Sequence, residues 1–93
     1  MDDQVVFAID DVSRVENNFW RVDGRAYQDV RVGDIVKPYD DRMARVQAAL
    51  AYTITAISTY GKDAPELSRG LTGSLIIEGL HGDLLRTGST LIR

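Results

Sequence analysis

The sequence has no cysteine, a single histidine and only two prolines among its 93 residues. Without cysteine, neither a disulfide framework nor a thiolate metal site can form, which argues against a disulfide-stapled secreted module. One histidine and scattered carboxylates do not give the ligand spacing of a metal site. We therefore expect no metal and no cofactor.

Long apolar runs are also missing. No stretch approaches the roughly 20 apolar residues that span a bilayer. A signal peptide would need a basic end and an uninterrupted apolar run, whereas the N-terminal segment carries acidic residues at Asp2, Asp3, Asp10, Asp11 and Glu16. These absences predict a cytoplasmic protein that does not contact membranes.

The residues that are present describe an ordinary globular chain. Hydrophobic residues make up 44% and charged residues 27% of the sequence, and the length fits one domain over residues 1–93. The net charge is −3, although nine of the eleven cationic residues are arginine. Because non-specific nucleic-acid binding depends on a surplus of Lys and Arg, this balance disfavours a nucleic-acid partner without excluding a local basic patch.

Alternating apolar residues predict several short strands. Val5, Phe7 and Ile9 indicate a strand from Gln4 to Val15, and a second strand is expected from Phe19 to Ala26. The Asp23-Gly24 pair inside this second strand has two interpretations. It forms either a two-residue hairpin turn or a site where a glycine lets two backbones approach closely.

The second half of the chain continues this pattern. Further strands are expected from about Ala51 to Tyr60, from Leu71 to Leu80 and, with an interruption, from Leu84 to Ile92. Gly61 to Gly70 is predicted to be a loop, and Arg42 to Ala49 fits a helix or a strand equally well. Short strands between glycine turns predict an all-β fold, namely a small closed or partly open β-barrel of about six or seven strands.

Short motifs carry a family resemblance when they are taken in chain order. They are Phe7–Val12, the V-x-G-R segment Val22-Asp23-Gly24-Arg25, the V-G-D segment Val32–Val36, Gly70 before the strand Gly73–Gly79, and Arg86-x-Gly88-Ser89-x-Leu91. In this order they resemble the second domain of translational GTPases of the elongation factor Tu type, which is a compact β-barrel. The resemblance covers nearly the whole chain and implies that fold.

The resemblance does not extend to the chemistry of those GTPases. No segment matches GxxxxGK[ST], and Gly70–Ser74 lacks the lysine and the spacing that cradle phosphates. We also find no residue-by-residue match for the positions with which such a domain holds the aminoacyl end of a tRNA. A tRNA-binding role would therefore rest on the fold alone.

His81 is the one candidate for catalysis. With the nearby Asp83 it has two parts of a proton relay, from which a small hydrolase could be built. No serine or threonine is fixed beside it as a nucleophile, so we favour a polar turn at Gly79–Gly82. The prediction is a chain without enzymatic activity.

Aromatic and arginine residues supply the candidate binding surface: Trp20, Arg21, Arg25 and Tyr27. An outward-facing tryptophan beside an arginine would suit a protein hot spot, whereas an inward-facing one would fill the core. The leading hypothesis is an intracellular protein-binding module, of the immunity or antitoxin type or an accessory subunit.

The alternative partner is RNA or tRNA. A nucleic-acid site would have to gather Arg21, Arg25 and Arg31 on one face, with Arg69 as an optional fourth arginine, against the interleaved Asp23, Asp29 and Asp34.

Overall fold

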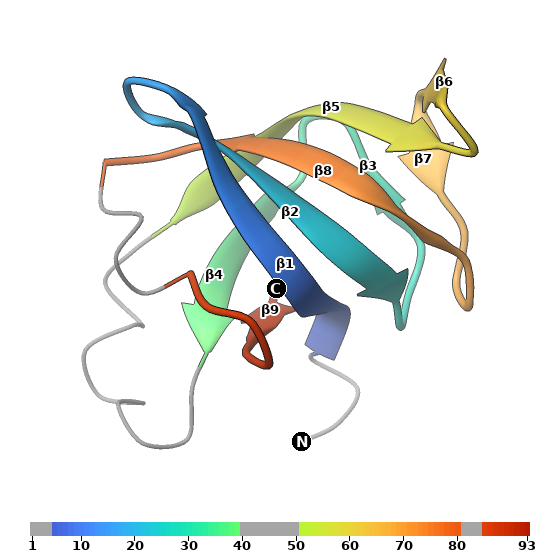
Figure 1. Ribbon diagram of the computed structural model, residues 1–93. Coiled ribbons are helices and arrows are strands. Elements are labelled where there is room, and N and C mark those ends of the chain that lie inside the picture. Colours follow the sequence, from blue (N-terminus) through green and yellow to red (C-terminus); the bar gives the residue numbers. More distant parts are fainter. Residues whose placement is uncertain (1–4, 40–50, 81–84) are drawn as a thin grey trace.

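A computed structural model describes residues 5–39, 51–80 and 85–93, and every regular element in these ranges is a β-strand (Figure 1). The strands are β1 (Val5–Glu16), β2 (Phe19–Ala26), β3 (Val30–Arg31), β4 (Ile35–Tyr39), β5 (Tyr52–Thr59), β6 (Lys62–Ala64), β7 (Glu66–Leu67), β8 (Thr72–Glu78) and β9 (Thr90–Ile92). The all-β prediction is therefore confirmed. Within the same ranges, no helix has the length and apolar character needed to cross a membrane. The undecided segment 42–49 lies outside the described residues.

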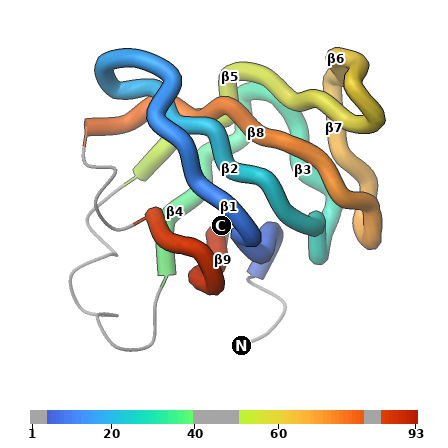
Figure 2. The backbone as a smooth tube through the Cα atoms, in the orientation of Figure 1, coloured from blue at the N-terminus to red at the C-terminus, as the bar shows by residue number. Residues whose placement is uncertain are grey.

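Six of the strands close into a ring. Their order is β4-β9-β1-β2-β8-β5, and β4 also pairs with β5, so the sheet returns to its starting strand (Figures 1 and 2). Every pairing around the ring is antiparallel. β6 adds to the far side of β5, while β3 and β7 form a separate two-stranded sheet. Closure removes most of the open strand edges that a flat sheet would expose. This agrees with the predicted small fold of six or seven strands.

Alternating burial explains why these segments pair as they do. In β2, Val22 and Ala26 are buried while Arg21 and Arg25 are exposed, as a two-residue period requires. In β5 the alternation changes phase: Tyr52 and Ile54 are buried, but the next buried residue is Ile57. A β-bulge between Ile54 and Ala56 causes this change, because it adds one residue to β5 relative to β8.

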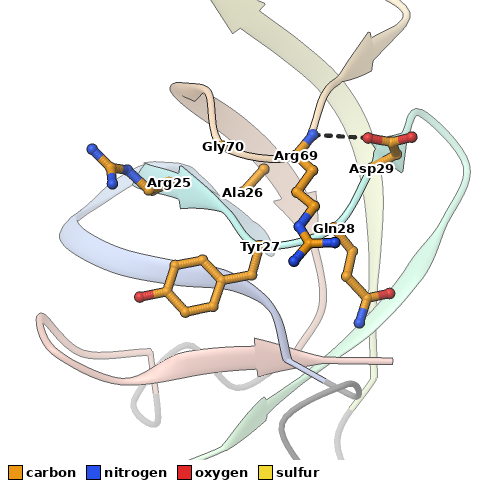
Figure 3. Close-up of a pocket in the computed structure, with 7 residues that line it drawn as sticks. All are labelled: Arg25, Ala26, Tyr27, Gln28, Asp29, Arg69 and Gly70. Carbon is orange, nitrogen blue, oxygen red and sulfur yellow. Dashed lines mark hydrogen bonds between the residues drawn. The ribbon is translucent and has the colours of Figure 1, made fainter.

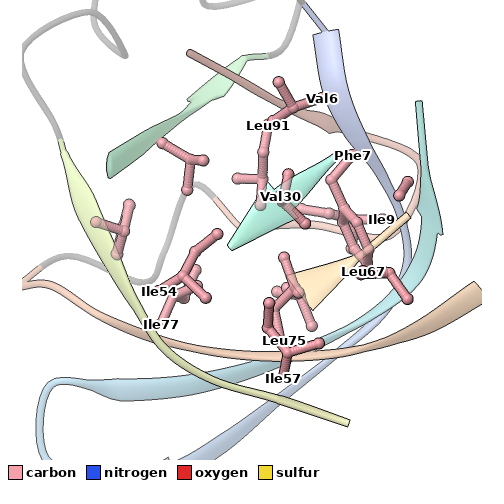
Figure 4. Packing of buried hydrophobic residues seen from close by; sticks show 14 of the residues in the cluster. Val6, Phe7, Ile9, Val30, Ile54, Ile57, Leu67, Leu75, Ile77 and Leu91 are labelled. Carbon is pink, nitrogen blue, oxygen red and sulfur yellow. The ribbon is translucent and has the colours of Figure 1, made fainter. Parts of the chain in front are cut away.

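The core fills the inside of the ring with aliphatic side chains and two aromatic rings (Figure 4). Its members come from eight strands and from Leu85. They are Val6, Phe7, Ile9, Val22, Ala26, Val30, Val36, Tyr52, Ile54, Ile57, Leu67, Leu75, Ile77, Leu85 and Leu91. Val30 and Leu67 belong to the separate β3–β7 sheet, so this small sheet closes one end of the ring over the same core. Burying one such side chain stabilises a fold by about 1.5–3 kcal/mol.

Gly24 resolves the two interpretations of the Asp23-Gly24 pair. It lies inside β2, opposite Ile9 on β1 and Gly73 on β8, and not in a turn. A Cβ atom at this position would overlap the carbonyl oxygen of Ala8 and lie 3.0 Å from the Phe7 ring. The glycine therefore lets β1 approach β2 closely at the point where β1 bulges between Ile9 and Asp11.

The prediction that Gly61–Gly70 forms a loop is wrong in part, because β6 and β7 lie within it. β6 pairs with the end of β5 through a two-residue connection, Tyr60-Gly61, in which both residues have positive φ angles of 53° and 76°. This is the geometry of a type I′ hairpin turn, which matches the twist of the flanking strands. A tyrosine at the first turn position conceals this turn in the sequence.

The last predicted strand, Leu84 to Ile92, is also shorter in the structure. Among the described residues of that range, 85–92, only Thr90–Ile92 form a strand, which pairs with both β1 and β4. Before it, residues 86–89 form a tight turn that is closed by the Ser89 N–H donating to the Arg86 carbonyl at 3.1 Å. Gly88 has a φ angle of 89°, which explains the interruption expected at this point.

Candidate functional site

A groove opens where the end of β2 meets the chain that leads into β8. Its lining residues are Arg25, Ala26, Tyr27, Gln28, Asp29, Arg69 and Gly70, and its volume is about 730 Å³ (Figure 3). The two sides of the groove are at least forty positions apart in the sequence and are brought together by the β2–β8 pairing, in which Arg25 lies opposite Thr72. Candidate residues from both sides contribute to the lining.

Backbone hydrogen bonds hold the two sides of the groove together. The Ala26 N–H donates to the Leu71 carbonyl at 2.9 Å, and the Gly70 N–H donates back to the Ala26 carbonyl at 2.8 Å. The carboxylate of Asp29 accepts a hydrogen bond from the Arg69 N–H at 2.8 Å, shown by the dashed line in Figure 3. Three bonds across so short a span fix the position of the Arg69 backbone relative to β2.

An exposed aromatic ring forms part of the groove floor. Tyr27 is 50% exposed, and its N–H donates to the Val6 carbonyl at 2.8 Å, so its backbone is held while its ring faces solvent. In Figure 3 the Arg69 side chain extends toward Tyr27 and Gln28, while the Arg25 side chain points away from the other two. Tyr27 and the two arginines thus line the same groove.

The two groove arginines differ from most others in having no side-chain partner among the described residues. Four arginines outside the lining do have such partners. Arg14 contacts Asn17 and the Trp20 ring, Arg21 contacts Asp23, Arg31 contacts Glu66, and Arg93 contacts Asp34. In the described ranges only Arg86 is a third arginine without a side-chain partner. Two of the three unpaired guanidinium groups therefore lie in one groove.

The local charge of the groove is weakly positive. Its lining contains two arginines and one aspartate, a formal sum of +1. Arg93 lies just outside, where its Nη2 donates to the Asp29 carbonyl at 2.8 Å and forms an ion pair with Asp34 at 3.5 Å. A small anionic group could approach both Arg25 and Arg69, but the groove lacks the cation density that a long polyanion needs.

Two of the four predicted partner-binding residues line the groove and two do not. Arg25 and Tyr27 lie together in the groove, whereas Trp20 and Arg21 lie outside its lining. Trp20 packs against the core, and its Nε1 donates to the Gly79 carbonyl at 3.2 Å. Arg21 is on the face of β2 opposite to Trp20, and its Nε pairs with Asp23 at 3.1 Å. The interpretation of Trp20 as an outward-facing hot spot is therefore not supported, because its indole is partly buried.

The predicted nucleic-acid set is also divided. Arg25 and Arg69 meet in the groove, but Arg21 and Arg31 are each neutralised by a carboxylate, Asp23 at 3.1 Å and Glu66 at 3.3 Å. Asp23 also bonds to the hydroxyl of Ser74 on β8. Two of the four arginines are thus engaged within the domain.

Sequence analysis did not identify Gln28, Asp29 and Gly70 as site residues. The sequence points to these residues only indirectly. If β2 is paired with β8 so that Gly24 lies opposite Gly73, the residues before β8 come to lie against the residues after β2. His81, the catalytic candidate, lies outside the described residues. Within the described ranges, no group of three or more His, Asp or Glu side chains is placed to hold a metal ion.

Comparison with known proteins identifies the fold. No family model and no curated protein matches the sequence. Among solved structures, the chain is similar to the apo form of translation elongation factor SelB from Methanococcus maripaludis, with a TM-score of 0.77 and 17% sequence identity. The match covers 95% of this chain but only 18% of the SelB chain. At this identity the likeness concerns the fold, and it confirms the expected translation-factor-like β domain.

Proposed function

We propose that this domain is a non-enzymatic protein-binding module whose contact surface is the Arg25–Tyr27–Arg69 groove. The observation that carries the proposal is the pair of guanidinium groups that have no side-chain partner among the described residues and line the same groove as a half-exposed tyrosine. Arginine and tyrosine are the residues most enriched at the energetic centres of protein interfaces. Because the backbone of the groove is held by hydrogen bonds on both sides, little ordering would be needed on binding.

The biological setting we propose is intracellular. An immunity or antitoxin-type protein that blocks another protein by charge complementarity fits this role, as does an accessory subunit of a larger assembly. Both settings require only a stable small fold that presents one surface.

A second candidate is an RNA-binding module related to translation. It is favoured by the likeness to part of a translation elongation factor and by an exposed aromatic ring, on which a base could stack, in the same groove as two arginines. The net charge of −3 and the groove sum of +1 make it the weaker candidate.

Site-specific photo-cross-linking distinguishes the two candidates. A benzophenone side chain at position 27, in the organism that encodes the domain, should give a discrete cross-linked protein species that nuclease treatment does not change. The same group at position 60 is the control, because Tyr60 is 82% exposed and lies outside the groove. The Arg25→Glu/Arg69→Glu double variant should abolish the species. A cross-linked species that nuclease removes would favour RNA, and equal cross-linking from both positions would refute the groove as the contact surface.

A further inference from the structure

The chemistry of the groove points to one class of partner segment. Its two unpaired guanidinium groups each present a planar set of N–H donors, and the half-exposed ring of Tyr27 lines the same groove. Guanidinium groups bind carboxylates through paired, charge-assisted hydrogen bonds. We propose that the groove binds an acidic peptide segment that carries an aromatic or apolar residue next to its carboxylates. This inference rests on the proposed function and names the partner chemistry of the same site.

The side-chain partners of the other arginines support carboxylates as the ligands of the two groove arginines. The other arginines with a carboxylate nearby already use it: Arg21 with Asp23, Arg31 with Glu66 and Arg93 with Asp34. Asp29 could in principle neutralise Arg69, but its Oδ1 accepts the Arg69 backbone N–H, and no side-chain contact joins the two residues. Asp29 therefore acts as a positioning residue that holds the Arg69 backbone, while the guanidinium group stays available to a ligand.

An acidic peptide fits the groove better than a nucleic-acid strand does. Each phosphate that a protein neutralises on a single strand contributes about −0.7 to the slope of log affinity against log salt concentration. Two arginines meet at most two phosphates, so the slope would be about −1.4, and the electrostatic attraction would be small at physiological salt. Two carboxylates held by two guanidinium groups need no further cations, and an aromatic or apolar residue of the same segment can pack on the half-exposed Tyr27 ring.

An unbiased selection tests this inference. A random peptide display library is panned against the immobilised domain, and the enriched peptides are then titrated into ¹⁵N-labelled protein. We expect the enriched set to be rich in Glu and Asp next to aromatic residues, and to shift the amide signals of residues 25–29 and 69–70. The Arg25→Gln/Arg69→Gln variant should bind at least about tenfold more weakly, since each guanidinium supplies a charge-assisted contact.

Arg86→Gln is the matched control, because it removes an equally unpaired guanidinium outside the groove lining, and it should bind like the wild type. A neutral or basic enriched set, shifts outside the groove, failure to enrich any peptide, or equal loss in both variants would overturn the acidic-segment inference. These outcomes leave the cross-linking result at position 27 free to support or refute protein binding separately. A mixed tRNA pool that shifts the same amides at near-physiological salt, more strongly than the selected peptides do, would overturn both proposals.

Discussion

Replacing Gly24 by alanine is expected to destabilise the domain more than the same change at any surface glycine. The added Cβ atom would overlap the carbonyl oxygen of Ala8 and come within 3.0 Å of the Ala8 carbonyl carbon and of Phe7 Cε2. The obstacle is mainly backbone, which cannot rotate away as the end of a flexible side chain can. β1 would therefore have to move away from β2 in the middle of the most extensive strand pairing of the ring.

The magnitude follows from what this movement breaks. A displacement of about 1 Å stretches the hydrogen bonds around Gly24 beyond useful length, and two such bonds contribute about 2 kcal/mol. Overpacking against Phe7 adds about 1–3 kcal/mol. Removing a glycine from a strand returns about 0.5–1 kcal/mol. The net loss is about 3 kcal/mol, a large part of the roughly 5–14 kcal/mol expected for a chain of this length. It corresponds to a fall in Tm of about 15 °C.

Urea unfolding provides the assay, with the fluorescence of Trp20, the one tryptophan in the sequence, as the signal. Gly33→Ala is the matched control, because a Cβ there would meet nothing within 4 Å and the cost comes only from the φ angle of 98°. We expect about 1 kcal/mol for that control. If Gly24→Ala unfolds at the same urea concentration as Gly33→Ala, the close approach of β1 to β2 is wrong.

Three further changes give smaller effects. Trp20→Phe removes the indole N–H that donates to the Gly79 carbonyl and should cost about 1 kcal/mol in thermal unfolding followed by circular dichroism; an unchanged Tm would refute a contribution from that bond. The Arg25→Gln/Arg69→Gln variant should unfold within about 0.5 kcal/mol of wild type, since neither side chain has a described partner, and a larger loss would show that the arginines serve the fold. The affinity of His81→Ala for a selected peptide, measured by the NMR titration described above, should lie within a few-fold of that of the wild type. A loss of affinity of about 10²-fold or more would show that this histidine contributes to the site.

The strands that could be predicted are those whose burial follows their alternation. β2 and β8 each bury every second side chain, and the sequence shows this directly. β6 was missed because Lys62-Asp63-Ala64 has no apolar alternation, so its pairing depends on the Tyr60-Gly61 turn and not on its own residues. A strand that adds to the outside of a ring buries little, and its sequence therefore carries little signal.

The sequence indicates which types of residue form the candidate site, but it does not indicate which of them lie together in space. The pair Arg25 and Tyr27 and the pair Trp20 and Arg21 have the same aromatic and cationic character, but only the first pair lines the groove. Strand alternation separates the second pair, because adjacent residues face opposite sides. The packing of Trp20 against the core and its bond to Gly79 depend on the neighbouring strand β8, which no local pattern reveals.

The likeness to SelB concerns the backbone fold, whereas the chemistry of the groove concerns the side chains that line it. A ring of this kind needs only apolar residues at inward positions and glycines at close approaches, so 17% identity is enough to keep it. Arg25 belongs to the V-x-G-R segment on which the resemblance to translational GTPases was based, and its presence is therefore compatible with either partner. Tyr27 and Arg69 lie outside the quoted motifs. Asp29 positions the backbone of Arg69, and a contribution of Arg69 to binding would therefore be a property of this chain's own surface. Variants at Arg69 accordingly distinguish a ligand that is specific to this domain from a ligand that is shared through the fold.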